Sequence, residues 1–183
     1  MEFPSKKQTI KITSNQQGSL FVSVIRSGIP VAGDEKAEEK NLSITVVYKT
    51  SKGEVLLPES IEQGTDFIAE VSIVNKGNTG EVKNIALSQV FPSGWEIQNM
   101  RLDNTQHLVN ESTYDYRDIR DDRVNTFFSL PASGSKRFKV LLTATYAGRY
   151  YLPAVNCAAM YDNTSYARTK GTWVEVIKKA TMP

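Results

Sequence analysis

The residue types that most often carry out catalysis are scarce in this chain. Its 183 residues include one histidine, His107, and one cysteine, Cys157. Nucleophilic catalysis needs a nucleophile beside a base, and acid–base catalysis needs a histidine or a tuned carboxylate. His107 lies in a polar stretch typical of a surface loop, and Cys157 lies in an apolar strand pattern, where a small thiol packs rather than reacts. We therefore expect no enzyme activity and no catalytic residue.

The sequence does not favour a metal site either. A zinc site made of histidine and cysteine needs several such ligands, so one of each excludes it. The acidic stretch 114–123 offers carboxylates of the kind that calcium prefers, but the arginines between them are fork-shaped partners for the same oxygens. We expect a structural ion-pair network here, formed by Asp115, Arg117, Asp118, Arg120, Asp121, Asp122 and Arg123. A cation site and a partner surface are the alternatives, and no cofactor is expected.

Composition and charge indicate a folded, soluble domain that does not bind nucleic acid. Hydrophobic residues make up 40% of the chain, which is too apolar for a disordered one. The 22 basic and 20 acidic residues are scattered, so no basic face for phosphates is predicted. The longest charged stretch, 34–40, mixes signs and is interpreted as a solvated loop. A single cysteine allows no internal disulfide, and no apolar run is long enough to span a bilayer.

Short runs with apolar side chains at alternate positions predict strands along most of the chain. The clearest are Leu42–Lys49 and Asp66–Asn75; the second places Phe67, Ala69, Val71 and Ile73 on one face. The other predicted strands, which bring the total to about ten, are 8–13, 20–25, 85–91, 95–97, 124–130, 136–145, 150–152, 154–161 and 172–177. The first two of these form a predicted hairpin.

The connections between these runs predict an antiparallel β-sandwich. Residues 131–135 are typical of a turn, so the runs 124–130 and 136–145 are expected to pair with each other. Residues 101–122 are polar and weakly periodic, and we interpret them as a long loop with at most one helical turn. Because no helices are available for crossovers, neighbouring strands should pair antiparallel in two packed sheets. The fold class is therefore all-β.

Five segments, taken in order, resemble one protein family over nearly the whole chain. They are 20–30, 87–97, 115–128 with its Asp-Tyr-Arg-Asp-Ile-Arg-Asp-Asp-Arg-Val run, 147–162 with Ala-Gly-Arg-Tyr-Tyr-Leu-Pro-Ala and Met-Tyr-Asp, and 167–174. Together they resemble the C-terminal macroglobulin-like domain, of MG10 type, in bacterial alpha-2-macroglobulins. The resemblance implies a β-sandwich of macroglobulin or fibronectin-III-like form.

The resemblance also implies a function for the protein of which this domain would be a part. Bacterial alpha-2-macroglobulins are envelope or periplasmic protease inhibitors that trap proteases with a thioester. The family's thioester joins a cysteine to a glutamine three positions on, and Cys157 is followed at that distance by Met160, so none is encoded here. In the family the last domain packs against the thioester domain and shields the thioester. By position, Tyr161 and Tyr166 are the candidates for that shielding loop; an ordinary exposed loop is the alternative.

The resemblance implies a domain boundary near residue 27. Residues 1–27 are expected to end a preceding, CUB-like domain that flanks the thioester domain, and residues 28–183 to form the sandwich. The expected partners are other domains of the same polypeptide and, through the complete protein, captured proteases; the fragment itself is expected to be a monomer.

A carbohydrate-binding or adhesive sandwich, with Tyr114, Tyr116, Tyr150 and Tyr151 as a sugar platform, is the alternative function. Alternation argues against it, because Tyr150 and Tyr151 must point to opposite faces of a strand.

Overall fold

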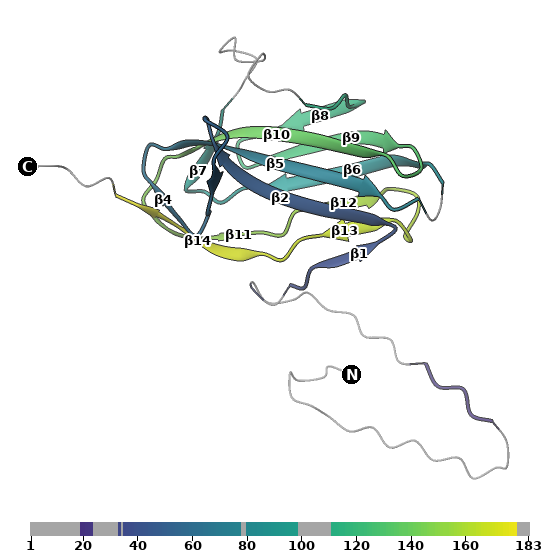
Figure 1. Ribbon diagram of the computed structural model, residues 1–183. Helices are drawn as coiled ribbons and strands as arrows, with labels where there is room; N and C mark the ends of the chain where they lie inside the picture. The colour runs from purple at the N-terminus through teal and green to yellow at the C-terminus, as the bar shows by residue number, and fades with distance from the viewer. Residues whose placement is uncertain (1–18, 24–32, 34, 78–79, 99–110, 179–183) are drawn as a thin grey trace, which may run out of the picture.

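The computed structural model describes residues 19–23, 33, 35–77, 80–98 and 111–178, and all the regular structure in these ranges is β-strand (Figure 1). The strands are β1 Glu38–Lys40, β2 Leu42–Thr50, β3 Val55–Leu56, β4 Ser60–Glu62, β5 Asp66–Asn75, β6 Val82–Val90, β7 Trp95–Ile97, β8 Tyr116–Ile119, β9 Arg123–Leu130, β10 Ser135–Ala144, β11 Gly148–Leu152, β12 Asn156–Ala159, β13 Tyr166–Arg168 and β14 Thr172–Ile177. The described ranges contain no helix long and apolar enough to cross a membrane.

The strands form two large sheets and one small one. Sheet A has the order β1-β13-β12-β6-β9-β8, sheet B the order β3-β2-β5-β10-β7, and sheet C the order β11-β14-β4. Figure 1 shows β2, β5 and β10 of sheet B lying over β6, β9 and β12 of sheet A, with sheet C at one end. The predicted all-β sandwich is confirmed, with sheet C as an addition to the two predicted sheets.

The core lies between the sheets and divides into two clusters. The first joins sheets A and B, and at its centre the rings of Phe128 from β9 and Phe138 from β10 are 4.7 Å apart between centroids. The second cluster lies beside sheet C. It contains the aromatic side chains Tyr48, Phe67 and Trp95 of sheet B, packed with Val174 and other apolar side chains of sheet C. Each large apolar side chain buried in this way contributes about 1.5–3 kcal/mol. Both ends of the sandwich are therefore held by packing.

The predicted alternation holds along β5. Phe67, Ala69, Val71 and Ile73 are all buried, at 0–1% exposure, as the core-facing side of the strand. β2 pairs with β5 over its whole length, from Leu42 opposite Asn75 to Thr50 opposite Phe67. These two strands form the centre of sheet B, and the sequence located both.

The prediction that β9 and β10 pair with each other is wrong. β9 pairs with β6 and β8 in sheet A, whereas β10 pairs with β5 and β7 in sheet B. The turn at 131–134 therefore carries the chain from one sheet to the other. Buried Asn75 fixes this crossing, because its side-chain amide donates to the carbonyls of Pro131, at 3.0 Å, and Gly80, at 2.8 Å. A turn motif in a sequence does not distinguish a hairpin from such a crossing.

Two further expectations need correction. Part of the predicted loop 101–122 is strand β8, which pairs with β9 at the edge of sheet A; residues 99–110, which include His107, lie outside the described residues. Pairing is not antiparallel throughout, since β14 pairs parallel with β4. β4 lies far from β14 in the sequence, so no local turn constrains their direction.

The charged stretch 34–40 is exposed over residues 36–40, as its composition predicts, but it is not simply a loop. Its last three residues form β1, which pairs with β13 at the edge of sheet A. Glutamates of this stretch are held by side chains of the sandwich: Glu35 by Tyr151, Glu38 by Tyr166 and Arg168, and Glu39 by Lys76. The hydrogen bond from Tyr151 holds the pKa of Glu35 below its usual range, and the one from Lys76 does the same for Glu39. This segment is therefore docked on the domain.

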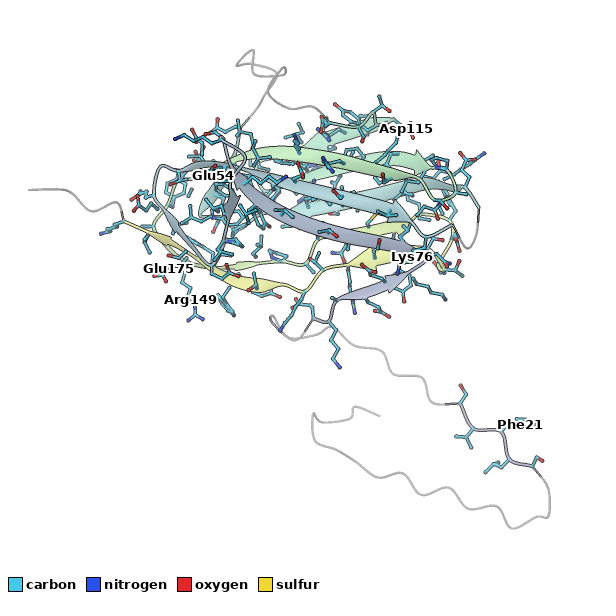
Figure 2. The ribbon with its side chains drawn as sticks, in the orientation of Figure 1. Phe21, Glu54, Lys76, Asp115, Arg149 and Glu175 are labelled. Atoms are coloured by element: carbon cyan, nitrogen blue, oxygen red, sulfur yellow. The ribbon has the colours of Figure 1, made fainter. Side chains whose placement is uncertain are left out.

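The predicted N-terminal hairpin lies mostly outside the described residues. Of its second strand, residues 20–23 are described; they form no strand, and Phe21 is 94% exposed (Figure 2). The predicted boundary at residues 27 and 28 also lies outside the described ranges.

Candidate functional site

The turn between β12 and β13 is braced by one carboxylate. The side chain of Asp162 accepts hydrogen bonds from the Thr164 backbone N–H at 2.9 Å, the Thr164 hydroxyl at 2.6 Å and the Ser165 hydroxyl at 2.7 Å. These bonds, first the one from the Thr164 hydroxyl, hold the pKa of Asp162 below its usual range. An acidic residue followed closely by threonine and serine is a common way to stabilise a turn. The Asp-Asn-Thr-Ser sequence is a local signal from which this turn could be predicted.

The same turn is tied to its neighbours through the backbone. The Ala159 N–H donates to the Ser165 carbonyl at 2.9 Å, and the Met160 N–H donates to the Asn84 carbonyl at 3.0 Å. The Asn41 side-chain amide donates to the Thr164 carbonyl at 2.9 Å. The turn is thus fixed to β6 and to the start of β2.

The two candidate tyrosines lie in different environments. Tyr161 projects from the turn with 84% of its surface exposed. Tyr166 is half-buried on β13, and its hydroxyl donates to Glu38 Oε1 at 2.9 Å. That hydrogen bond raises the pKa of Tyr166. Only the ring of Tyr161 is therefore presented to a neighbouring surface, and an aromatic ring on a rigid turn can exclude water from a group that it covers.

Two of the ion pairs in the predicted network lie close enough to interact electrostatically with each other. Arg120 contacts Asp118 at 2.9 Å and Arg123 contacts Asp122 at 2.6 Å, both at the surface, while Asp115 and Asp121 take part in no ion pair among the described residues.

Arg117 has a different and more buried partner, Glu111, which the sequence analysis missed. The two side chains make a bidentate pair with both N–O distances 2.9 Å, and the Arg117 side chain is only 4% exposed. The guanidinium also stacks on the Tyr114 ring, 4.2 Å from its centroid, and donates to the Thr126 hydroxyl at 3.1 Å. Glu111 Oε2 in turn accepts from the backbone N–H of Lys139 in β10. This pair links the edge of sheet A to sheet B, and no local sequence pattern identifies Glu111.

Cys157 lies in the core. It is 1% exposed on β12, and burial raises the pKa of its thiol to about 12. Within the described ranges, no three histidine, cysteine, aspartate or glutamate side chains are grouped so as to hold a metal ion.

The four tyrosines of the possible sugar platform do not share a surface. Tyr150 packs on the core beside sheet C, and Tyr151 lies on the opposite side of β11, where its ring is 5.5 Å from that of Trp173. Tyr114 packs against the first core cluster, and Tyr116 stacks on Phe127 on sheet A. Figure 2 shows Arg149, on the same side of β11 as Tyr151, pointing away from the sandwich. The described residues therefore offer no single aromatic platform.

Comparison with known proteins identifies the family. A family model for the bacterial alpha-2-macroglobulin MG10 domain matches residues 42–163. The chain belongs to this family. The match includes Tyr161 and the turn residue Asp162, whereas Tyr166 and β14 lie beyond it.

Solved alpha-2-macroglobulin structures share the fold of this MG10 domain. The native conformation of the Escherichia coli protein superposes with a TM-score of 0.68 and 16% identity, covering 82% of this chain and 10% of that chain. A native E. coli structure that spans domain MG7 to the C-terminus superposes with a TM-score of 0.67 and 17% identity, covering 76% of this chain and 24% of that chain. The Salmonella protein reacted with methylamine superposes with a TM-score of 0.65 and 18% identity, covering 78% of this chain and 10% of that chain.

One curated protein is also similar to part of this chain. Circularly permutated Ras protein 2 of Dictyostelium discoideum is 28% identical over 86 residues, which is 47% of this chain and 2% of that protein. The chain thus spans only a small part of the relatives that it matches.

Proposed function

We propose that this domain is a non-catalytic, C-terminal part of an alpha-2-macroglobulin-like protease trap in the periplasm or cell envelope. In this proposal it packs against the thioester domain of the same polypeptide and shields the thioester until a protease is captured. Family membership supports the proposal, as do the relatives, which include an E. coli alpha-2-macroglobulin activated by trypsin and a Salmonella one reacted with methylamine.

The observation that carries this proposal is the display of Tyr161. Its ring is the most exposed aromatic group on the sandwich, and it lies on a turn fixed by Asp162 and by backbone hydrogen bonds. Ordering a loose loop on binding costs conformational free energy, whereas a pre-fixed turn avoids that cost. A ring held in this way suits the exclusion of water from a reactive ester.

Tyr166 has a supporting role in this proposal. Its hydroxyl is bonded to Glu38, so it joins β13 to β1 and helps to hold the base of the turn. The domain contributes no nucleophile, because Cys157 is buried and its thiol is protonated at neutral pH. The thioester chemistry would belong to another domain.

The test is the reactivity of the thioester toward methylamine in the complete protein. Tyr161→Ala is expected to speed the reaction at least about tenfold, since water and small amines would gain access to the ester. Tyr161→Phe should keep the slow rate, because the ring and not the hydroxyl provides the cover. Tyr146→Ala is the matched control: Tyr146 is also exposed, at 55%, but lies between β10 and β11. A wild-type rate in Tyr161→Ala would refute the shielding role.

A further inference from the structure

The outer face of sheet A has one row of side chains in register across all six strands. The row is formed by Tyr116 of β8, Phe127 of β9, Ala86 of β6, Ala158 of β12, Tyr166 of β13 and Lys40 of β1, each paired with the next. We call this the alanine row. Its two central side chains are the smallest, and aromatic side chains stand on both sides of them.

The side chains next to the alanine row are also short, so the centre of this face is a shallow depression between larger side chains. The next row along the same strands has Asn125, Ser88 and Asn156 opposite one another. Ala158 is exposed, and beyond it on the same strand side lies Met160, 48% exposed, next to Tyr161. A face with a floor of small side chains and aromatic walls fits a partner that presents large apolar side chains.

The width of this floor fits an α-helix. From β9, which carries Phe127, to β13, which carries Tyr166, there are three strand spacings, or about 14 Å. An α-helix with its side chains is about 10–12 Å wide. A helix lying along β6 and β12 would therefore lie between the two aromatic walls and complete a helix-on-sheet layer.

The area of the face favours another domain of the same polypeptide over a second copy of this chain. Six strands span about 24 Å, and Asn156 to Met160 along β12 span about 14 Å, so the face measures on the order of 340 Å². A stable complex buries about 800 Å² per partner. Interfaces between domains of one chain bury about 600–1,500 Å² in total, or about 300–750 Å² per side. The solved relatives are about eight times as long as this chain, so a polypeptide of that kind has further domains that could supply the helix.

We propose that the outer face of sheet A is the docking site for an α-helix of another domain of the same polypeptide, which packs large apolar side chains on Ala86 and Ala158. The proposal deepens the proposed function, because the same docking would bring Tyr161, at the end of β12, over the neighbouring domain. It does not depend on the thioester itself.

Thiol labelling in the complete protein tests the docking. Ala158→Cys introduces a thiol at the centre of the face, and Thr45→Cys introduces a control thiol at an exposed mid-strand position on sheet B. The native Cys157 does not interfere, because it is buried. Each labelling rate is divided by the rate of the same thiol in the unfolded protein. The resulting ratio for maleimide at position 158 should be at least tenfold smaller than the ratio at position 45. Equal rates would overturn the proposal.

Photo-crosslinking identifies the occupant. Tyr116→p-benzoylphenylalanine exchanges one aromatic side chain for another at the end of the alanine row, and the same change at Tyr146 is the control. The expected crosslink from position 116 is to a helical peptide outside residues 1–183 of the same polypeptide. A crosslink to a second copy of this domain, or none above the level at position 146, would overturn the proposal.

Failure of the docking proposal and failure of the shielding proposal give different results. If the face is docked but Tyr161 does not cover the thioester, labelling at 158 stays slow while methylamine reacts at the wild-type rate in Tyr161→Ala. If Tyr161 covers the thioester without this docking, the methylamine effect is present and labelling at 158 is as fast as at 45.

Discussion

The outer face of sheet B is charged at its centre, whereas the outer face of sheet A has small neutral side chains there. On sheet B, Glu70 is surrounded by Lys49 at 2.8 Å, Arg137 at 3.6 Å and Lys139 at 3.7 Å. On sheet A the corresponding place is occupied by Ala86 and Ala158. Both faces lie on the outside of one sandwich, so the core does not require the difference.

The difference indicates that the outer face of sheet B is exposed to water and that the outer face of sheet A is covered by a partner. Lysine and arginine side chains around a carboxylate form a polar surface that is stable in water. A row of alanines with aromatic neighbours is hydrated only weakly, so covering it with the apolar surface of a partner is favourable in free energy. Substitutions in both sheets test this contrast.

The largest effect is expected where the two sheets meet, since the faces exist only while the sheets stay packed. Arg117→Ala should lower the free energy of unfolding by about 3 kcal/mol, because it removes a guanidinium that is only 4% exposed and leaves the partly buried carboxylate of Glu111 without its partner. Denaturant titration measures this. The double change Arg117→Met with Glu111→Leu should recover much of the loss. Arg120→Ala, which removes a surface pair, should leave the unfolding midpoint unchanged; an equal loss there would contradict a special role for Arg117.

The charged centre of sheet B should depend on Glu70. Glu70→Gln is expected to cost about 1–3 kcal/mol, because the carboxylate, only 9% exposed, loses its charge-assisted hydrogen bond to Lys49. Glu81→Gln, at the exposed pair with Lys83, is the control and should show no change in unfolding midpoint.

The same residue predicts a pH dependence. Burial alone would raise the pKa of Glu70, but Lys49, Arg137 and Lys139 outweigh it and hold the pKa below its usual value of 4.5. The unfolded chain then binds the proton more readily, so this stabilisation is present above pH 4.5 and is lost as the pH falls through the lower, folded-state pKa. Wild-type stability should therefore fall more steeply below pH 4.5 than that of Glu70→Gln. Parallel pH profiles would contradict this.

A smaller and local effect is expected at the turn next to the alanine row. Asp162→Ala removes the acceptor for three hydrogen bonds, so amide hydrogen exchange at residues 163–165 should become several-fold faster with little change in global stability. Asp162→Asn keeps the Oδ1 acceptor and should be intermediate. If exchange is unchanged in Asp162→Ala, backbone bonds alone fix the turn.

The smallest effect on the isolated domain is expected at the alanine row. Ala158→Thr adds a β-branched side chain at an exposed strand position, so its effect on stability should stay within about 0.5 kcal/mol. The same substitution in the complete protein should speed thiol labelling at a second site on this face, Ser88→Cys, because the added methyl and hydroxyl lift the partner from the floor. A large loss of stability in the isolated domain would show that Ala158 is a core residue instead.

Sequence reasoning located the strands whose burial alternates. β2 and β5 carry apolar side chains at every second position, so their period alone identifies them. β8 was missed because the side chain that it turns inward is Arg117, a charge where the pattern requires an apolar residue. A charged group buried with its partner hides a strand from any test of hydrophobic period.

Contacts between distant residues account for the other differences. The glutamates of the 35–40 segment find their partners in Lys76, Tyr151 and Tyr166, which are 37–128 positions away, so their charge pattern alone resembles that of a loop. The pairing of β9 and β10 with different sheets depends in the same way on β6 and β5. Tyr161 was predicted only through the family resemblance. The hydrogen bonds of Asp162, in contrast, join it to Thr164 and Ser165, so the local sequence is sufficient to predict them.

The parallel pairing of β14 with β4 has a consequence for synthesis of the chain. β14 is the middle strand of sheet C, and its partner β4 ends at Glu62, 110 residues before β14 begins at Thr172. At about 5–20 residues per second, a ribosome would complete β4 roughly 5–20 s before its partner exists. During that interval Ile61 has no neighbouring strand, so the nascent chain has an unpaired edge that a chaperone could cover.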